Sequence, residues 1–164
     1  MNRQTLKRFI IDFCRCGIAG WCLEVMFTSV DSMMAGDWRL IGKTSLIMFP
    51  IYGMGVLLRP IGLWMDGWLS GIPKAPCPGN GLSPAARAIR HGLLYMVLIF
   101  TAEYLTGMAL KFFGICPWDY SSWPDQVDGV IRLSFAPLWF GTGLLFERMT
   151  ENKTEKRTVH EAKT

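Results

Sequence analysis

Four long apolar stretches alternate with short polar segments along the chain. The stretches cover residues 9–34, 45–69, 88–113 and 130–149. A helix needs about 20 mostly apolar residues to cross a lipid bilayer, and each stretch has roughly that length, although the first and the fourth also contain charged residues. The pattern predicts an all-α integral membrane protein, with a four-transmembrane-helix bundle in residues 1–150 and a disordered polar tail in residues 151–164.

The charged residues between these stretches predict how the helices are oriented. Most Lys and Arg residues lie before the first stretch, around the Pro/Gly-rich loop 70–84 and in the tail, whereas loop 114–129 contains three aspartates. Basic segments next to membrane spans usually stay in the cytoplasm. We therefore expect a multi-pass protein of the cell membrane with both termini in the cytoplasm and loop 114–129 outside, although Arg39 and Lys43 in the first outer loop weaken this charge difference.

The overall composition agrees with a membrane setting. Hydrophobic residues make up 51% of the chain and charged residues only 18%, whereas about a quarter of the residues of a soluble domain are charged. The net charge of +4 is small and lies mostly at the termini, so we expect no nucleic-acid partner. The five cysteines lack the CxxC spacing of metal or redox sites, and His91 and His160 are isolated in the sequence. We therefore expect no metal site and no cofactor.

Two glutamates lie near the middle of predicted spans. Glu24 and Glu103 are each roughly 15–20 Å from the cytoplasmic ends of their helices, in a hydrocarbon core about 30 Å thick. A carboxylate at that depth costs at least a few kcal/mol unless it is protonated, paired or exposed to a wet cavity. We therefore expect both side chains to face the interior of the bundle rather than lipid.

Small and polar residues recur at helical spacing along one face of each of the first three spans. They are Gly17, Gly20, Glu24, Thr28 and Asp31 in the first, Tyr52, Gly55, Arg59, Gly62 and Asp66 in the second, and Glu103, Thr106 and Gly107 in the third. Such seams let neighbouring helices approach closely and turn polar groups inward. We expect the three seams to share one polar interior.

The two glutamates allow two interpretations. They could bind a cation, relay protons or hold the amine of a substrate, or they could anchor helices through hydrogen bonds to side chains such as Tyr52 and Trp21. An intramembrane acid is by default a functional hypothesis, and we favour binding over anchoring. Arg59 lies closer to the cytoplasmic edge, where its side chain could also extend toward the interface.

The residues Trp118, Asp119 and Tyr120 follow the third span directly. They are typical of an interfacial aromatic belt with a turn, or they form an outer gate over the carboxylates. The predicted binding residues are therefore Glu24, Glu103, Tyr52, Asp119, Tyr120, Trp118, Arg59 and Trp21, and no catalytic residue is predicted.

The two halves of the chain resemble each other, which predicts a parallel repeat of two helical hairpins. Glu24 and Glu103 precede a tryptophan by fourteen and fifteen residues respectively. The segment "PIYGMGVLLR" (50–59) also resembles "PLWFGTGLLFE" (137–147), with one residue inserted before the first glycine. Chance similarity is the alternative, because glycine and aromatic residues are frequent in this chain.

The motifs "GWCLEVMF", "FPIYGMG", "AEYLTG" and "CPWDYSSW" occur in this order along the chain. Together they resemble the type IV ABC-transporter permease family (CmpB-like), which includes the eukaryotic transmembrane protein 229. The resemblance extends from residue 17 to residue 147; it implies a polytopic α-helical membrane protein, and the family name implies transport. The matching residues here are Trp21, Glu24, Pro50, Tyr52, Gly53, Glu103, Tyr104, Gly107, Trp118, Asp119 and Tyr120. Bacterial members often carry a second acid where this chain has Lys111, so the resemblance does not support a mechanism that needs two acids in the third helix.

The sequence therefore favours a small transporter or permease component with an intramembrane carboxylate site. A non-catalytic membrane scaffold or assembly factor, in which the acids only anchor helices, is the first alternative. An intramembrane enzyme that acts on lipid is the second. Expected partners are membrane lipid, a second copy of the chain, because four helices enclose little space, and a separate energising protein.

Overall fold

The computed structural model describes residues 3–70 and 83–151, and most of them are helical, as the sequence predicts. The helices are α1 (Arg3–Met34), α2 (Met48–Gly53), α3 (Leu58–Ser70), α4 (Pro84–Phe112) and α5 (Ala136–Met149), with 3-10 turns η1 (Met54–Leu57) and η2 (Leu133–Phe135) and short strands β1 (Gln126–Val127) and β2 (Ile131–Arg132). Outside the described residues lie residues 152–164 of the tail that is predicted to be disordered, Cys77 and most of loop 70–84.

Two of the four predicted spans are long and apolar enough to cross a membrane. They are Met48–Leu69, which combines α2, η1 and α3, and Pro84–Phe112, which is α4. α1 has 32 residues but carries several charged side chains, and α5 has only 14 residues. A 14-residue helix is about 21 Å long, which is shorter than a hydrocarbon core of about 30 Å. The four-helix transmembrane bundle therefore stays a prediction for α1 and α5.

The second predicted span is a continuous helical segment with a joint at η1. Pro60 explains the joint, because proline has no backbone N–H and its ring crowds the carbonyl four residues earlier, here that of Val56. The chain tightens into a 3-10 turn at this point, and the N–H of Leu58 donates to the carbonyl of Gly55. A 3-10 turn inside a long helical segment often marks a hinge.

Helix α5 corresponds to the fourth predicted span. It begins at Ala136, six residues after residue 130, where that span is predicted to begin. The intervening residues contain β2 and η2. β2 pairs with β1 in a hairpin whose turn has positive φ angles at Asp128 (52°) and Gly129 (72°). Two consecutive residues of this kind are typical of a type I′ turn, which an Asp-Gly pair adopts readily. The hydrogen bond from Ser134 N–H lowers the pKa of Asp125, so the carboxylate that caps the start of η2 is charged at neutral pH.

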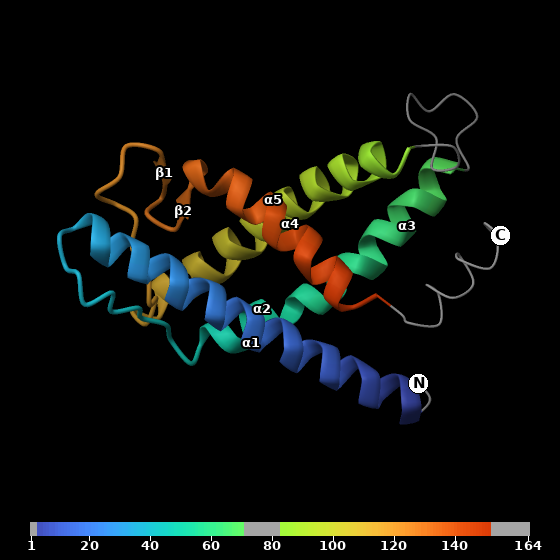
Figure 1. The fold of residues 1–164 in the computed structure, drawn as a ribbon, viewed down its shortest axis with the longest axis horizontal. Helices are drawn as coiled ribbons and strands as arrows, with labels where there is room; N and C mark the ends of the chain where they lie inside the picture. The colour runs from blue at the N-terminus through green and yellow to red at the C-terminus, as the bar shows by residue number, and fades with distance from the viewer. Residues whose placement is uncertain (1–2, 71–82, 152–164) are drawn as a thin grey trace.

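The helices pack as two pairs, α1 with α2 and α4 with α5. Figure 1 shows the loops after α1 and after α4 at one end of the molecule, whereas the start of α1, the end of α3 and the start of α4 lie at the other. A buried cluster of Cys16, Leu58, Tyr95 and Phe146 joins the two pairs at the centre. The loop within each pair therefore lies at the same end of the molecule.

Large apolar side chains are exposed on the outer faces of the helices. Met26 on α1 is 67% exposed, Trp64 on α3 is 70% exposed and Leu105 on α4 is 63% exposed. Soluble monomers rarely leave broad apolar surfaces in water. These faces are suited to contact with lipid chains.

Candidate binding cavity

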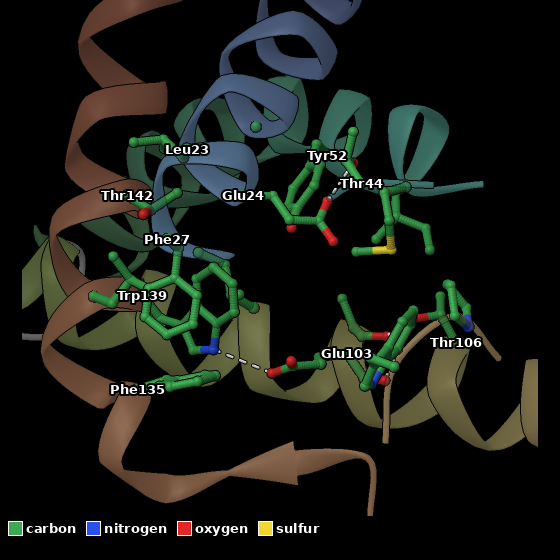
Figure 2. A pocket seen from close by; sticks show the side chains of 18 of the residues that line it. Leu23, Glu24, Phe27, Thr44, Tyr52, Glu103, Thr106, Phe135, Trp139 and Thr142 are labelled. Atoms are coloured by element: carbon green, nitrogen blue, oxygen red, sulfur yellow. Dashed lines mark hydrogen bonds between the residues drawn. The ribbon is translucent and has the colours of Figure 1, made fainter. Parts of the chain in front are cut away.

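A cavity of about 620 Å³ lies between α1, α2, α4 and α5, and the loops at one end of the molecule cover part of it. Its lining is mostly apolar. Glu24 on α1 and Glu103 on α4 extend into it from opposite walls (Figure 2). Two acids that are 79 positions apart in the sequence therefore share one interior space.

Glu24 is held by the loop that follows α1. The hydroxyl of Thr44 donates a hydrogen bond of 2.7 Å to Glu24 Oε2, and the side chain of Tyr52 on α2 is a second partner. The loop is fixed in turn because the N–H of Lys43 donates to the hydroxyl oxygen of Thr28 at 2.8 Å. Gly20 lies one turn before Glu24, and only its missing side chain lets Tyr52 pack so close to α1.

Glu103 has an equivalent partner on α5. The indole N–H of Trp139 donates to Glu103 Oε2 at 3.1 Å, and the Trp139 ring packs edge-on against Phe135. Figure 2 shows Glu24 with Tyr52 and Glu103 with Trp139 around the same cavity.

The aromatic partners of the two acids lie in the two similar segments "PIYG" and "PLWFG". Counted from the proline that begins each repeated segment, Tyr52 in "PIYG" and Trp139 in "PLWFG" occupy the same position. Each aromatic residue contacts the acid of its own helix pair. The same local arrangement thus occurs twice in one cavity.

The segment Trp118-Asp119-Tyr120 covers the loop end of the cavity. Trp118 is fixed by its indole N–H, which donates to the carbonyl of Val130 at 3.0 Å. Hydrogen bonds from the hydroxyl and the backbone N–H of Ser121 hold the pKa of Asp119 below its usual range. Asp119 therefore contributes a negative charge to the lining at neutral pH.

Tyr120 is tied to the β1–β2 hairpin, because its backbone N–H donates to the carbonyl of Gly129 at 2.8 Å. Its ring packs edge-on against Phe135. Burial, followed by the nearby charges of Glu103 and Glu24, raises the pKa of the Tyr120 hydroxyl. Tyr120 therefore remains a neutral hydrogen-bond donor that lines the cavity.

The model of the family described as "Putative ABC-transporter type IV" matches residues 11–163. The chain belongs to this family. No solved structure matches the chain. Membership of the type IV ABC-transporter family and two helices suited to a membrane agree with a transporter-like membrane protein.

Six of the eight predicted binding residues of this family member line the cavity. The two that do not are Trp21 and Arg59. The indole of Trp21 donates to the carbonyl of Ser45 at 3.0 Å and packs against Phe49, 4.9 Å between ring centres. Arg59 lies on α3 beyond the joint at η1 and is half-buried there. Trp21 therefore packs between α1 and α2 outside the cavity lining.

The charged residues of the lining are mostly acidic. Glu24, Asp31, Glu103 and Asp119 line the cavity together with one cation, Lys43. Acidic side chains therefore outnumber basic ones in the lining of the cavity. The excess of acidic side chains makes the potential in the cavity negative, because low-dielectric walls focus the field of these charges into the space between them.

Sequence reasoning missed Trp139, although the alignment of "PIYG" with "PLWFG" contained the signal. It also missed the aromatic wall formed by Phe27 and Phe135, whose rings meet edge-on at 4.8 Å. Within residues 3–70 and 83–151, no group of three or more His, Cys, Asp or Glu side chains is arranged to hold a metal ion.

Proposed function

We propose that the chain is the membrane component of a transporter and that its cavity binds a cationic substrate through Glu24 and Glu103. The observation that carries this proposal is the pair of acids that extend into one mostly apolar cavity from two different helix pairs. A carboxylate in such surroundings is costly unless it is protonated or a positive charge compensates it. A bound cation supplies that charge.

The walls favour an organic cation over a hydrated metal ion. Aromatic rings of Phe27, Phe135 and Trp139 line the cavity beside the two acids. Aromatic faces attract alkylated ammonium groups, at about 0.5–2 kcal/mol per contact. Hard metal ions instead need about six or more oxygen ligands, and the mostly apolar lining is poorly suited to supply them. The expected substrate is an amine or quaternary ammonium with an apolar body.

Binding of three matched probes tests this proposal. Butyltrimethylammonium, its neutral analogue with carbon in place of nitrogen, and butanesulfonate differ in charge at similar size. Titration calorimetry with the purified chain in lipid nanodiscs should detect binding of the cation, weaker binding of the neutral probe and none of the anion. Equal binding of the cation and the neutral analogue would contradict a carboxylate site.

Substitution of either acid should weaken the binding of the cationic probe. Glu24→Gln and Glu103→Gln keep the size of each side chain and remove one charge, so each should weaken cation binding by about 1.5–3 kcal/mol, or roughly 10- to 100-fold. Asp37→Asn removes an acid outside the cavity lining and should leave binding unchanged. If the acids only anchor helices, both Gln variants lower thermal stability while the affinity for the cation stays the same.

The proposal also assigns a topology, with four membrane crossings and both termini in the cytoplasm. The grouping of the two connecting loops at one end of the molecule supports it (Figure 1). Single cysteines at Ser122 and Gln4, in a variant without the native cysteines, test it by labelling intact cells with an impermeant maleimide. We expect labelling at Ser122→Cys in intact cells and at Gln4→Cys only after permeabilisation; the reverse pattern would overturn the orientation.

Two partners belong to the same proposal, namely a separate energising chain and a second copy of this chain. Membership of a family of ABC-transporter components supports the first. Mass measurement of complexes extracted from the membrane without detergent tests both, because a monomer without other chains would contradict both.

A further inference from the structure

A second polar cluster lies outside the cavity, where α3, α4 and α5 meet. Its centre is His91 on α4, whose side chain is only 2% exposed. His91 Nδ1 lies 2.7 Å from Glu147 Oε1 on α5, and Nε2 lies 3.0 Å from Asp66 Oδ1 on α3. The sequence suggested an isolated histidine, because these partners are 56 and 25 positions away.

Among the residues that the structure describes, the charged and titratable groups in contact with this cluster come from the same three helices. Asp66 on α3 also pairs with two arginines of α4, with Arg87 Nε at 2.9 Å and with Arg90. The hydroxyl of Tyr95 on α4 lies 3.3 Å from His91 Nδ1. On α5, Glu147 contacts His91 and has Tyr95 as a second neighbour.

The geometry around the ring requires an additional proton. A neutral imidazole has one N–H and one lone pair, so it can donate to only one of two carboxylates. The lone pair of its other nitrogen would then point at the lone pairs of the second carboxylate, and this contact would be repulsive. Both contacts of His91 are favourable together when the ring carries two N–H groups, one for each carboxylate.

We propose that His91, Asp66 and Glu147 form a proton-binding site that holds α5 against α4 while the proton is bound. Loss of the proton leaves the contact with one carboxylate repulsive. Asp66 still has Arg87 and Arg90 as ion-pair partners. By contrast, Glu147, among the described residues, keeps the neutral hydroxyl of Tyr95 and the more distant charge of Arg87. The contact between His91 and Glu147 therefore weakens first, and α5 is the helix that is released.

The same helix carries part of the cavity wall. Phe146, next to Glu147, lines the inner end of the cavity and packs in the buried cluster with Tyr95. Further along α5, Trp139 donates the hydrogen bond to Glu103. Release of α5 would therefore disturb a contact of the cavity acid, so the proton site is coupled to the cavity. This coupling rests on the proposed function, whereas the proton site itself does not.

The protonation state of His91 can be measured directly. The chain has only two histidines, His91 and His160, so His160→Gln leaves a single imidazole. Nitrogen-15 spectra of that variant in lipid should show two protonated ring nitrogens near neutral pH and loss of one proton at higher pH. Glu147→Gln should lower the pH of that step by about one unit or more, and Asp37→Asn should not change it. A ring with a single N–H at neutral pH would overturn the proposal.

The distance between α4 and α5 tests whether loss of the proton releases α5. Spin labels at exposed Ile89 on α4 and Leu145 on α5, in a variant without native cysteines, should move apart across the same pH step. Adding His91→Gln to the labelled protein should abolish this pH dependence. A proton that titrates without a change in label distance would overturn the coupling. Failure of the cationic probe to bind in the cavity would leave the spectra unchanged, so the two proposals fail separately.

Discussion

Replacing Asp66 with asparagine should lower the free energy of unfolding by about 3–5 kcal/mol, the cost of breaking a buried ion pair from one side. The Asp66 side chain is 14% exposed, and Arg90 beside it is 15% exposed. In the variant, Arg87 and Arg90 keep their positive charges and His91 keeps its ring N–H. All three lose the carboxylate that pairs with them. Chemical denaturation in mixed micelles measures the change.

The matched control is Asp37→Asn. Asp37 and Arg39 form a 2.8 Å ion pair within one exposed loop, and such pairs contribute about 0–1 kcal/mol. A loss at Asp66 as small as the loss at Asp37 would mean that water screens the cluster of α3, α4 and α5. A double variant that also replaces Arg90 with methionine should recover part of the loss, because it removes the uncompensated charge.

Alanine at two neighbouring glycines of α5 should have opposite effects on stability. A Cβ atom at Gly143 would overlap the Cβ of Tyr95 and lie 3.2 Å from its ring, and Tyr95 is fully buried. Because α4 and α5 cannot both keep their positions, Gly143→Ala should destabilise the protein by about 1–3 kcal/mol. A Cβ atom at Gly141 would meet nothing within 4 Å, so Gly141→Ala should stabilise the helix by about 0.5–1 kcal/mol.

The sign of the difference is the useful measurement, because both variants add the same methyl group to the same helix. Thermal unfolding followed by circular dichroism in one detergent should give a lower midpoint for Gly143→Ala than for the parent and a higher one for Gly141→Ala. Equal shifts would mean that α5 does not pack on Tyr95.

Much of this fold can be predicted from the chain because its reasons are local. Apolar runs of sufficient length predict most of the helical segments, and Ser83 caps α4 by accepting a hydrogen bond from the backbone N–H of Ala86, as serine commonly does. The start of α5 could not be predicted from hydropathy, because Val130 and Ile131 are apolar residues that pack in the hairpin after the Asp-Gly turn. Turn geometry outweighs hydrophobicity there.

The chain alone indicates that Glu24 and Glu103 avoid lipid, since the cost of an unpaired carboxylate in hydrocarbon does not depend on the details of packing. It also contains the similarity between "PIYG" and "PLWFG", in which Tyr52 and Trp139 occupy the same position. The three-dimensional arrangement of the helices was needed to show that both acids line one cavity, that Trp21 and Arg59 lie outside it, and that His91 sits between Asp66 and Glu147. Those contacts join residues far apart in the chain, so they depend on how whole helices cross, which side-chain spacing within one helix does not encode.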